Sequence, residues 1–585
     1  MIEEQAGREP IQIVEIVQKK CQHTYGVAPC TASGATGEEC FNTRFTCQDV
    51  ENYSAVTASE LSLFFCRGYV GEQAPEIDGI DYLIPSLKSV STTPTRINLT
   101  AADPDAKGLG NRAVLTVTFN DHSHSDQIVD PYVNTRPYNP RERGTFWTKW
   151  LIRNKFRYNF TIRVYEGYVG QALADMSKRS FIITDVTGPT ARNEVTIKGK
   201  DLLARIEERK AQAPVASRGE LETDILAAAT EFPVVGAALA DYDASGLVRI
   251  GDEIIAYSSI AEVGNTLVFT VSERGAEGTV ADDHTVEDTV QLCLKYDNKS
   301  PDFIAEDLLK NYGNVPVANI NTTLFASEAD NYLSLYDLTV VISEPVAVTQ
   351  LLSELQVECG FLLWWNERTA LIDFKAVRGV TEDPPLITSE EHILAGSFSI
   401  TEMPRSRISQ VWFHYNLKDP TLSLSSGNYR SIPIIADLPS EGEDQYGEAS
   451  VRTIFSRWIN SSALALNTMS KIISRYAVVP RKATFAMDAK DRTHWVGDTI
   501  RISHFRDVDQ FGERQIKNWT IISAEEIKPG DVVQYTVEDT SLYGLIGTIQ
   551  ANTATDYTPG DDLYLGWIGD ANGLLSDGNN CTRTS

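Results

Sequence analysis

Four of the eight cysteines in this chain stand in Cys21-Gln22-His23-Thr24-Tyr25-Gly26-Val27-Ala28-Pro29-Cys30 and Cys40-Phe41-Asn42-Thr43-Arg44-Phe45-Thr46-Cys47. The stretch is rich in glycine and polar residues, and a loop-rich segment of this size cannot build a hydrophobic core of its own. Thiolate sulfur is a soft ligand that suits zinc and iron–sulfur clusters. We therefore expect the fold of this stretch to depend on what its four thiols bind.

The spacing of the four cysteines, C-x8-C-x9-C-x6-C, matches neither the ferredoxin patterns nor the paired C-x2-C of zinc ribbons. From the residues alone a bound metal or cluster is the leading interpretation, while zinc, disulfides and simple burial stay open. Cys66 follows Leu63-Phe64-Phe65, and these apolar neighbours predict a buried structural thiol. The remaining cysteines, Cys293, Cys359 and Cys581, are scattered singly.

The overall composition limits the class of protein. At 585 residues the chain is too long for a single core and is expected to form about three to five domains. Tyr and Phe are plentiful (23 and 21), Met is scarce (5) and Gly is frequent (38), which favours a β-rich protein with many turns. A net charge of -28 argues against nucleic-acid binding through a basic face, although an acidic wall would let DNA slide past without sticking.

Two further sequence features concern the cellular compartment. No stretch reaches the roughly 18 apolar residues of a membrane-spanning helix, so no direct membrane span is expected. The acidic N-terminus Met1-Ile2-Glu3-Glu4-Gln5 lacks the basic start and apolar core of a signal peptide. We therefore expect synthesis in the cytoplasm, where disulfides are disfavoured and clustered cysteines indicate metal binding.

Strand and helix patterns divide the chain into seven expected segments. Apolar and polar residues alternate from Leu115 to Phe119 and from Phe160 to Val164, which predicts antiparallel strands with one wet face. Helices are expected at 201–211, 301–312, 345–359 and 452–475. The expected segments are an N-terminal arm (1–20), a Cys-rich segment (21–75), a first β domain (76–200), a helix plus a small inserted β module (201–298), an α+β domain (299–400), a β domain with one long helix (401–545) and a C-terminal tail (546–585).

Three other groups of residues suggest a ligand site, and each has a plainer interpretation. Asp121-His122-Ser123-His124-Ser125-Asp126 suggests a metal site but is more typical of a solvated turn. The stretch from Asp241 to Asp252 imitates a calcium loop without its flanking helices or closing Glu. Trp364-Trp365 suggests sugar stacking but follows a helix end into a hairpin, where core or interface packing is expected. The sequence holds no hydrolase, metalloprotease or Walker motif.

The setting CQHTYGVAPC…CFNTRFTCQD resembles the cysteine segment of tail-tip hub proteins of long-tailed phages, including relatives of the lambda-type minor tail protein that carries a [4Fe–4S] cluster. Other parts of the chain also resemble phage tail hub and baseplate proteins: DPYVNTRPYN (130–139), GTFWTKWLIRN (144–154), IRVYEGYVG (162–170) and RGAEGTVADDHTVEDTV (274–290). Residues 343–377 and 494–504 resemble the gp27-like hub module. In this chain the cluster segment comes first, whereas in lambda-type proteins it follows an N-terminal domain.

The resemblance implies a fold and a function. The fold would be multidomain and mainly β with α+β modules, a gp27-like hub with β-barrel domains and an N-terminal Cys-rich cluster segment. The protein would be a non-enzymatic structural hub at the tail tip of the virion, a homotrimeric ring that connects the tail tube to the tip fibre or central spike. Its partners would be the distal tail protein above, a tip fibre or receptor-binding protein below, and phage DNA that passes through the lumen without specific binding.

The same resemblance implies a cofactor. Cys21, Cys30, Cys40 and Cys47 match the positions that ligate a [4Fe–4S] cluster, with zinc as the weaker alternative, and Cys66 falls outside the pattern. The cluster would have a structural role in the Cys-rich segment.

Two other functions stay open at the level of sequence. An iron–sulfur redox protein or metalloenzyme would need a second cofactor site or paired acid and base groups. A carbohydrate-binding β protein would need Trp364, Trp365 and Trp412 to be exposed for stacking on sugar rings.

Overall fold

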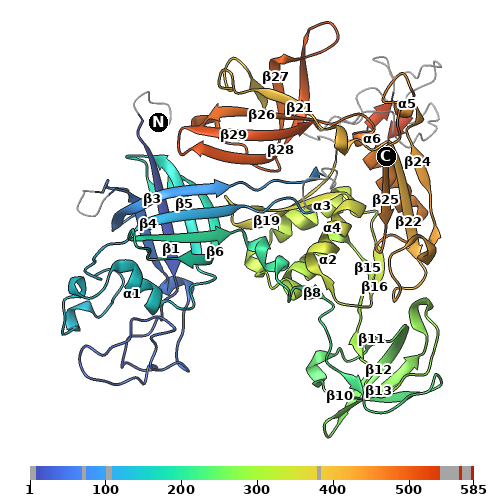
Figure 1. Cartoon of the computed structure of the whole chain (residues 1–585), viewed down its shortest axis with the longest axis horizontal. Coiled ribbons are helices and arrows are strands. Elements are labelled where there is room, and N and C mark those ends of the chain that lie inside the picture. The colour runs from blue at the N-terminus through green and yellow to red at the C-terminus, as the bar shows by residue number, and fades with distance from the viewer. Residues whose placement is uncertain are drawn as a thin grey trace.

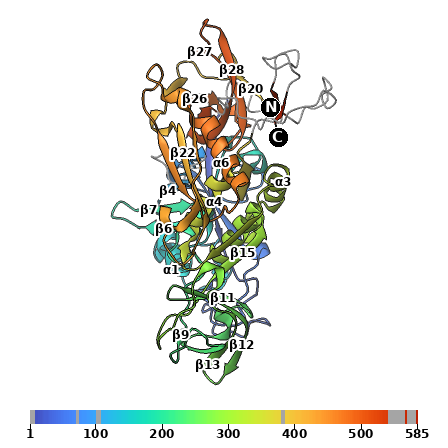
Figure 2. The ribbon, with the colours of Figure 1, turned by 90° about the vertical axis from the view of Figure 1, so that its right-hand side faces the viewer.

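The computed structural model describes residues 8–68, 74–99, 108–378, 384–539, 566–568 and 582–584. In this part of the chain the protein is mainly β, with several sheets around a central group of helices (Figure 1). The side view places a small β module (residues 220–292) and a C-terminal sheet (residues 386–539) at opposite ends of the molecule (Figure 2). The expected multidomain, mainly β fold with α+β modules is confirmed.

The N-terminal part of the chain forms a closed seven-stranded barrel in the order β1-β2-β3-β4-β7-β6-β5. Its strands are β1 (Pro10–Gln18), β2 (Leu61–Arg67), β3 (Leu83–Thr93), β4 (Val114–Asn120), β5 (Thr161–Tyr168), β6 (Ser177–Thr187) and β7 (Glu194–Lys200). Neighbouring strands are antiparallel except β2 and β3, which run parallel. The alternation expected from 115 to 119 is confirmed, because Leu115, Val117 and Phe119 are buried in the barrel core.

A short helix, α1 (Phe146–Arg153), packs on this core. The ring of Trp147 lies 4.7 Å from that of Phe119 and 5.4 Å from that of Phe65, measured between centroids. Thr145 caps the helix, since its hydroxyl accepts a hydrogen bond from the backbone N–H of Thr148.

The segments expected at 1–20 and 21–75 each contribute a strand to the barrel. β1 pairs with β2 on one side and with β5 on the other. Cys66 is buried in β2 opposite Ile13, as its apolar neighbours predict. Residues 19–60 leave the barrel between β1 and β2 and return to it as one long excursion.

A small module forms a six-stranded sheet in the order β14-β11-β12-β13-β10-β9. Its strands are β9 (Glu220–Leu221), β10 (Glu231–Val235), β11 (Gly246–Ile250), β12 (Glu253–Val263), β13 (Thr266–Glu273) and β14 (Gln291–Leu292). Its separate core includes the stacked rings of Phe232 and Phe269, whose centroids are 4.9 Å apart. Figure 1 shows this module projecting from the rest of the molecule.

The helix expected at 201–211 is wrong in length and type. A 3-10 helix, η7 (Leu202–Glu207), turns Leu202, Leu203 and Ile206 into the central core. It cannot continue, because β8 (Gln212–Ala213) is extended and pairs with β17 (Val346–Ala347).

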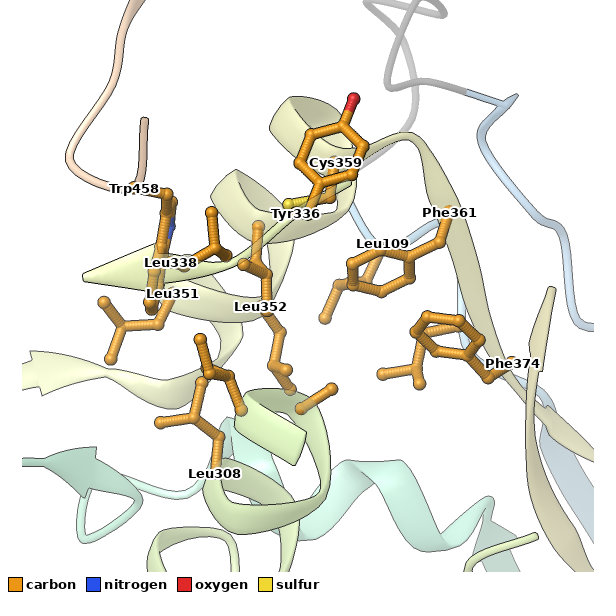
Figure 3. Close-up of a cluster of buried hydrophobic side chains, with 14 of the residues drawn as sticks. Leu109, Leu308, Tyr336, Leu338, Leu351, Leu352, Cys359, Phe361, Phe374 and Trp458 are labelled. Carbon is orange, nitrogen blue, oxygen red and sulfur yellow. The ribbon is translucent and has the colours of Figure 1, made fainter. Parts of the chain in front are cut away.

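The central α+β region contains the largest hydrophobic cluster (Figure 3). Its helices and strands are α2 (Pro301–Asp307), the π-helical turn η10 (Leu308–Tyr312), α3 (Thr322–Tyr332), α4 (Val348–Cys359), β15 (Leu294–Lys299), β16 (Leu338–Ile342), β18 (Phe361–Asn366) and β19 (Leu371–Ala376). The helix expected at 301–312 is present as α2 followed by η10. The helix expected at 345–359 begins at Val348, because Val346 and Ala347 form β17, and it ends at Gly360 with φ +75°, a left-handed position that glycine adopts readily. Cys359 lies in the cluster beside Tyr336 (Figure 3).

The expected helix at 452–475 is only half right. Helix α6 covers Ser462–Tyr476, whereas β25 (Val451–Phe455) forms a strand parallel to β22 (Gln410–Leu417). The strand forms because Ile454 is β-branched and buries against the core that Phe413 of β22 also enters. The same small sheet contains β23 (Tyr429–Ser431) and β24 (Ile434–Ala436), and α5 (Leu438–Glu441) follows it.

The last large unit is a six-stranded sheet in the order β20-β27-β28-β29-β26-β21. Its strands are β20 (Leu386–Thr388), β21 (Ser399–Glu402), β26 (Arg481–Asp488), β27 (Thr499–Val508), β28 (Arg514–Lys528) and β29 (Val532–Asp539). Of the expected tail, only the paired strands β30 (Gly566–Ile568) and β31 (Thr582–Thr584) are described, and Cys581 lies outside the described residues. Among the described helices, none has the length and apolarity that a bilayer crossing requires.

Candidate metal centre

The four predicted ligands come together. Cys21, Cys30, Cys40 and Cys47 line one small pocket, whose cavity volume is about 10 Å³. All four are free thiols, of which Cys40 is buried and the other three are half-buried. The described residues contain no group of three or more His, Cys, Asp or Glu side chains already arranged to hold a metal ion.

The thiol pocket lies in a segment that has almost no buried side chains. Residues 19–56 are all described, and they contain no helix or strand. Only two of their side chains, those of Cys40 and Thr43, are buried. The apolar burial that stabilises an ordinary fold is therefore missing here, and the thiols occupy the place of a core.

Asn42 shapes the backbone around the pocket. Its carbonyl accepts a hydrogen bond of 2.7 Å from the N–H of Cys21, and its side-chain amide donates to the carbonyls of Cys21 and His23 at 3.5 Å. Its φ is +54°, in the left-handed region that asparagine tolerates better than most residues. The thiol of Cys40 donates to Asn42 Oδ1 at 3.5 Å, and that of Cys47 donates to the Asp49 carbonyl at 3.1 Å.

The thiols influence one another electrostatically. Burial is the main cause that raises the pKa of Cys40 and of Cys47, and the charges of the neighbouring thiols add to it. Burial likewise raises the pKa of Tyr53 to about 12, with the charges of Cys21 and Cys47 adding to it. Four thiolates in this pocket would repel one another, so a bound cation or cationic cluster is what allows them to ionise together.

Arg136 attaches the cysteine segment to the barrel domain. Its guanidinium donates to the backbone carbonyls of Gly37 at 2.9 Å, Glu39 at 2.6 Å and Cys40 at 3.3 Å. On its other edge, Nε and Nη2 form a bidentate pair with Asp130 at 2.8 and 3.0 Å. A single buried side chain thus joins three carbonyls of the segment to a buried carboxylate of the barrel domain.

Other contacts join the same two parts of the chain. The ring of Phe41 contacts two guanidinium groups, that of Arg136 at 4.2 Å and that of Arg153 at 3.9 Å from the ring centroid. Thr43 Oγ1 donates to the Arg153 carbonyl at 2.6 Å, and the Tyr132 hydroxyl accepts from the backbone N–H of Tyr25 at 2.8 Å. The cysteine segment and residues 130–153 of the barrel domain therefore form one continuous unit.

The Asp121–Asp126 stretch has a structural role and is not a solvated turn. Asp121 accepts hydrogen bonds from Thr145 and Trp147 at the start of α1. Asp126 is buried and pairs with Lys149 and Arg153, each at 2.8 Å. Burial alone would raise the pKa of Asp126, but its hydrogen bonds and these cations lower it to about 2.

The other two candidate sites, Asp241–Asp252 and Trp364–Trp365, belong to a strand and to the packed core. β11 (Gly246–Ile250) runs through the Asp241–Asp252 stretch, so the chain is extended where a calcium loop would wrap. Trp364 and Trp365 are buried, and Trp365 Nε1 donates to the Ser180 carbonyl at 3.1 Å. The core packing predicted for them is confirmed, and of the three candidate stacking residues Trp412 alone is exposed, at 40%.

Sequence reasoning missed Arg136 and Asn42. Arg136 contacts carbonyls that lie nearly one hundred residues earlier in the chain, so no local pattern marks it. Asn42 lies inside the cysteine stretch. Because asparagine tolerates left-handed backbone, its presence there could have predicted a turn that brings the cysteines together.

No family model matches this chain, and no curated protein matches it. Among solved structures, the 43 kDa tail protein of prophage MuSo2 from Shewanella oneidensis is 10% identical, with 78% of this chain and 98% of that chain covered at a TM-score of 0.34. The tail protein from Neisseria meningitidis MC58 is 10% identical, with 66% and 90% covered at 0.33. A chain of the lidded Francisella PdpA–VgrG complex is 9% identical, with 94% and 57% covered at 0.32. At TM-scores this far below 0.5, the likeness assigns neither a family nor a function.

Proposed function

We propose that this protein is a structural hub of a phage tail tip, and that Cys21, Cys30, Cys40 and Cys47 hold a [4Fe–4S] cluster in it. The observation that carries the proposal is the segment 19–56, whose interior is a thiol pocket in place of packed apolar side chains. When bound, the cluster supplies four strong bonds between distant points of the segment and so contributes folding free energy. The role of the cluster is structural.

The donor set fits a cluster. Four thiols line the pocket, and each ligates as a thiolate. The irons of a cubane cluster stand at separate corners, so its cysteines are held farther apart than four sulfurs around one zinc ion, each about 2.3 Å from the metal. The sequence resemblance makes an iron–sulfur cluster the first choice, and zinc is the alternative that the experiment must distinguish.

The hub role rests on the sequence resemblance. The cysteine segment and the barrel domain, which both carry that resemblance, are joined by Arg136. We propose that the chain forms a homotrimeric ring in the tail tip of the virion, between the distal tail protein above and the tip fibre or central spike below. Phage DNA would pass through the ring without specific binding, which suits a chain with a net charge of -28. The protein would act as a connector and would not be an enzyme.

The cluster is tested by purifying the full chain without oxygen. We expect a brown protein with broad visible absorption and with iron and acid-labile sulfide in equal amounts. Cys30→Ser and Cys47→Ser, at half-buried positions, should lose the colour, while Cys293→Ala in the small module should keep it. A colourless protein with one zinc would replace the cluster by zinc, and a protein without iron or zinc would refute the metal site.

The hub role needs a separate test on assembled particles. Gold-labelled antibodies against the purified chain should bind one end of the tail in electron micrographs of phage particles from the cells that encode it. Label on the capsid, or none on the particles, would contradict the hub role and leave the cluster result unaffected.

A further inference from the structure

An aromatic and basic surface lies beside the cysteine segment. Phe45 of that segment and Phe156, after α1, meet edge to face with centroids 6.3 Å apart, and the Lys155 ammonium lies 4.4 Å from the Phe45 ring. The aromatic–basic patch consists of these three residues with Ile152, Arg157 and Tyr158. Its apolar members are unusually exposed: 42% for Phe45, 62% for Ile152, 63% for Phe156 and 45% for Tyr158.

The charge of this patch is opposite to that of the molecule. Its charged members are Lys155 and Arg157, and the same stretch of chain exposes Arg141 and Arg143 beside one acidic residue, Glu142, in a chain with a net charge of -28. The other cations of the stretch, Arg136, Lys149 and Arg153, are paired with the buried carboxylates of Asp130 and Asp126. A local reversal of this kind orients an acidic partner and does not serve solubility. Exposed aromatic side chains next to Arg and Lys are also the residues that concentrate binding energy at interfaces.

A surface of the opposite character lies at the end of the small module. Two loops, 222–229 and 280–288, are joined there by paired backbone hydrogen bonds of 2.9 Å between Ile225 and His284. The acidic tip that they form exposes Leu226 (69%), Val280 (81%) and Val286 (49%). The same two loops expose the carboxylates of Glu222, Asp224, Asp282, Asp283 and Glu287 and contain no Lys or Arg. A cation that contacts both loops, Arg274, is paired with the buried carboxylate of Glu253.

The two surfaces complement each other but are separated within one chain. Figure 1 shows α1, which carries Ile152, on the opposite side of the molecule from the module of β10 to β13. Each surface combines exposed apolar side chains with charges of one sign, and the signs are opposite. A contact between them requires two copies of the chain.

We propose that the aromatic–basic patch of one copy binds the acidic tip of the next copy. The contact is head to tail, with different surfaces on the two sides, and such contacts close into rings when the rotation between copies permits. It therefore rests on the proposed hub function and specifies which surfaces build the ring. Because Phe45 stands two residues before Cys47, filling the thiol pocket also fixes one side of the interface.

The test measures the association of the full, cluster-loaded chain by sedimentation velocity over a range of concentrations. Phe156→Asp on the patch and Val280→Asp on the tip should each weaken association on the order of tenfold or more, since they place a charge in the apolar centre of the contact. Neither side chain makes a hydrogen bond. Val263→Asp, at the far hairpin of the same module and 63% exposed, is the matched control and should associate like the wild type.

Mixing the two defective variants distinguishes this contact from others. Phe156→Asp retains an intact tip and Val280→Asp an intact patch, so an equimolar mixture should form a 1:1 complex and nothing larger. No complex in the mixture, or a wild-type chain that stays monomeric at all concentrations, would overturn the proposal. The visible absorption of the cluster, measured on the same samples, reports separately on the metal site.

Discussion

The replacement Arg136→Ala tests how the cysteine segment is held. Arg136 donates its two shortest bonds to the segment at 2.6 and 2.9 Å, to the carbonyls of Glu39 and Gly37. A hydrogen bond from a charged donor contributes roughly 1.5–3 kcal/mol, and water will partly replace it when the segment opens. Taking the lower figure for each bond gives about 3 kcal/mol, which corresponds to on the order of a 100-fold change in the equilibrium between docked and open segment.

Hydrogen exchange followed by mass spectrometry measures that equilibrium directly. In the metal-free protein, peptides that cover residues 30–47 should exchange on the order of 100-fold faster in Arg136→Ala than in the wild type. Removal of Arg136 also leaves the carboxylate of Asp130 buried and unpaired, which lowers global stability by roughly 3–5 kcal/mol. The effect on the segment must therefore be separated from a general loss of stability.

Arg481→Ala provides the control. Arg481 pairs with two buried carboxylates, Asp507 at 3.0 Å and Asp539 at 3.2 Å, in the C-terminal sheet. Its loss should destabilise the protein by a similar amount without touching the segment. If Arg136→Ala accelerates exchange in residues 30–47 by no more than Arg481→Ala does, the assignment of Arg136 as the docking residue is refuted.

Four further outcomes are expected. Gly37→Ala should reduce the free energy of docking of the segment by roughly 1–3 kcal/mol, because Gly37 has φ +94° and an added Cβ would lie 2.5 Å from Pro137 Cδ. Gly427→Ala, where an added Cβ has nothing within 4 Å, is the control and should not change hydrogen exchange in the segment. Docking of the metal-free segment should be fully stable below about pH 8.5 and should weaken as the pH rises past that value. The reason is that burial raises the folded pKa of Cys40 and Cys47 above the unfolded value. Limited proteolysis that cuts the segment equally at pH 7 and pH 9.5 would contradict this. Asp126→Asn should remove about 2 kcal/mol of stability that the wild type has above pH 4 and loses as pH falls through 2, since the folded pKa of Asp126 is lowered to about 2; in urea titrations the gap at pH 3 should be about half of the gap at pH 7. Trp365→Phe should lower the free energy of unfolding by about 1–3 kcal/mol by orphaning the Ser180 carbonyl, while Trp412→Phe at an exposed position should change it by less than about 0.5 kcal/mol.

The parts of the fold that followed from sequence are those with a local signal. The alternation of Leu115, Val117 and Phe119 predicted a barrel strand, and Gly360 predicted the end of α4, because period and backbone freedom are properties of a few neighbouring residues. The strand at Val451–Phe455 was mistaken for helix, because its conformation is set by pairing with β22, some forty residues earlier.

The candidate site shows the same division. The four cysteines were found because their residue type is itself the signal, and the structure brings them to one pocket. Arg136 was not found, since an arginine that binds three distant carbonyls looks like any surface arginine in sequence. The role of Asp126 was also misjudged, because only the fold brings Lys149 and Arg153 to it.

The position of the cysteine segment within the barrel has a consequence for how such proteins diversify. Gln18, the last residue of β1, lies opposite Leu61, the first residue of β2, so both ends of the excursion leave from neighbouring points of one antiparallel pair. A tight turn would join these strands equally well, and the entropy of closing a loop rises only slowly with its length. The segment can therefore be lengthened, exchanged or lost by a single insertion or deletion while the order of the barrel strands stays the same. The proposed metal centre could therefore be added or removed at this place without a new scaffold.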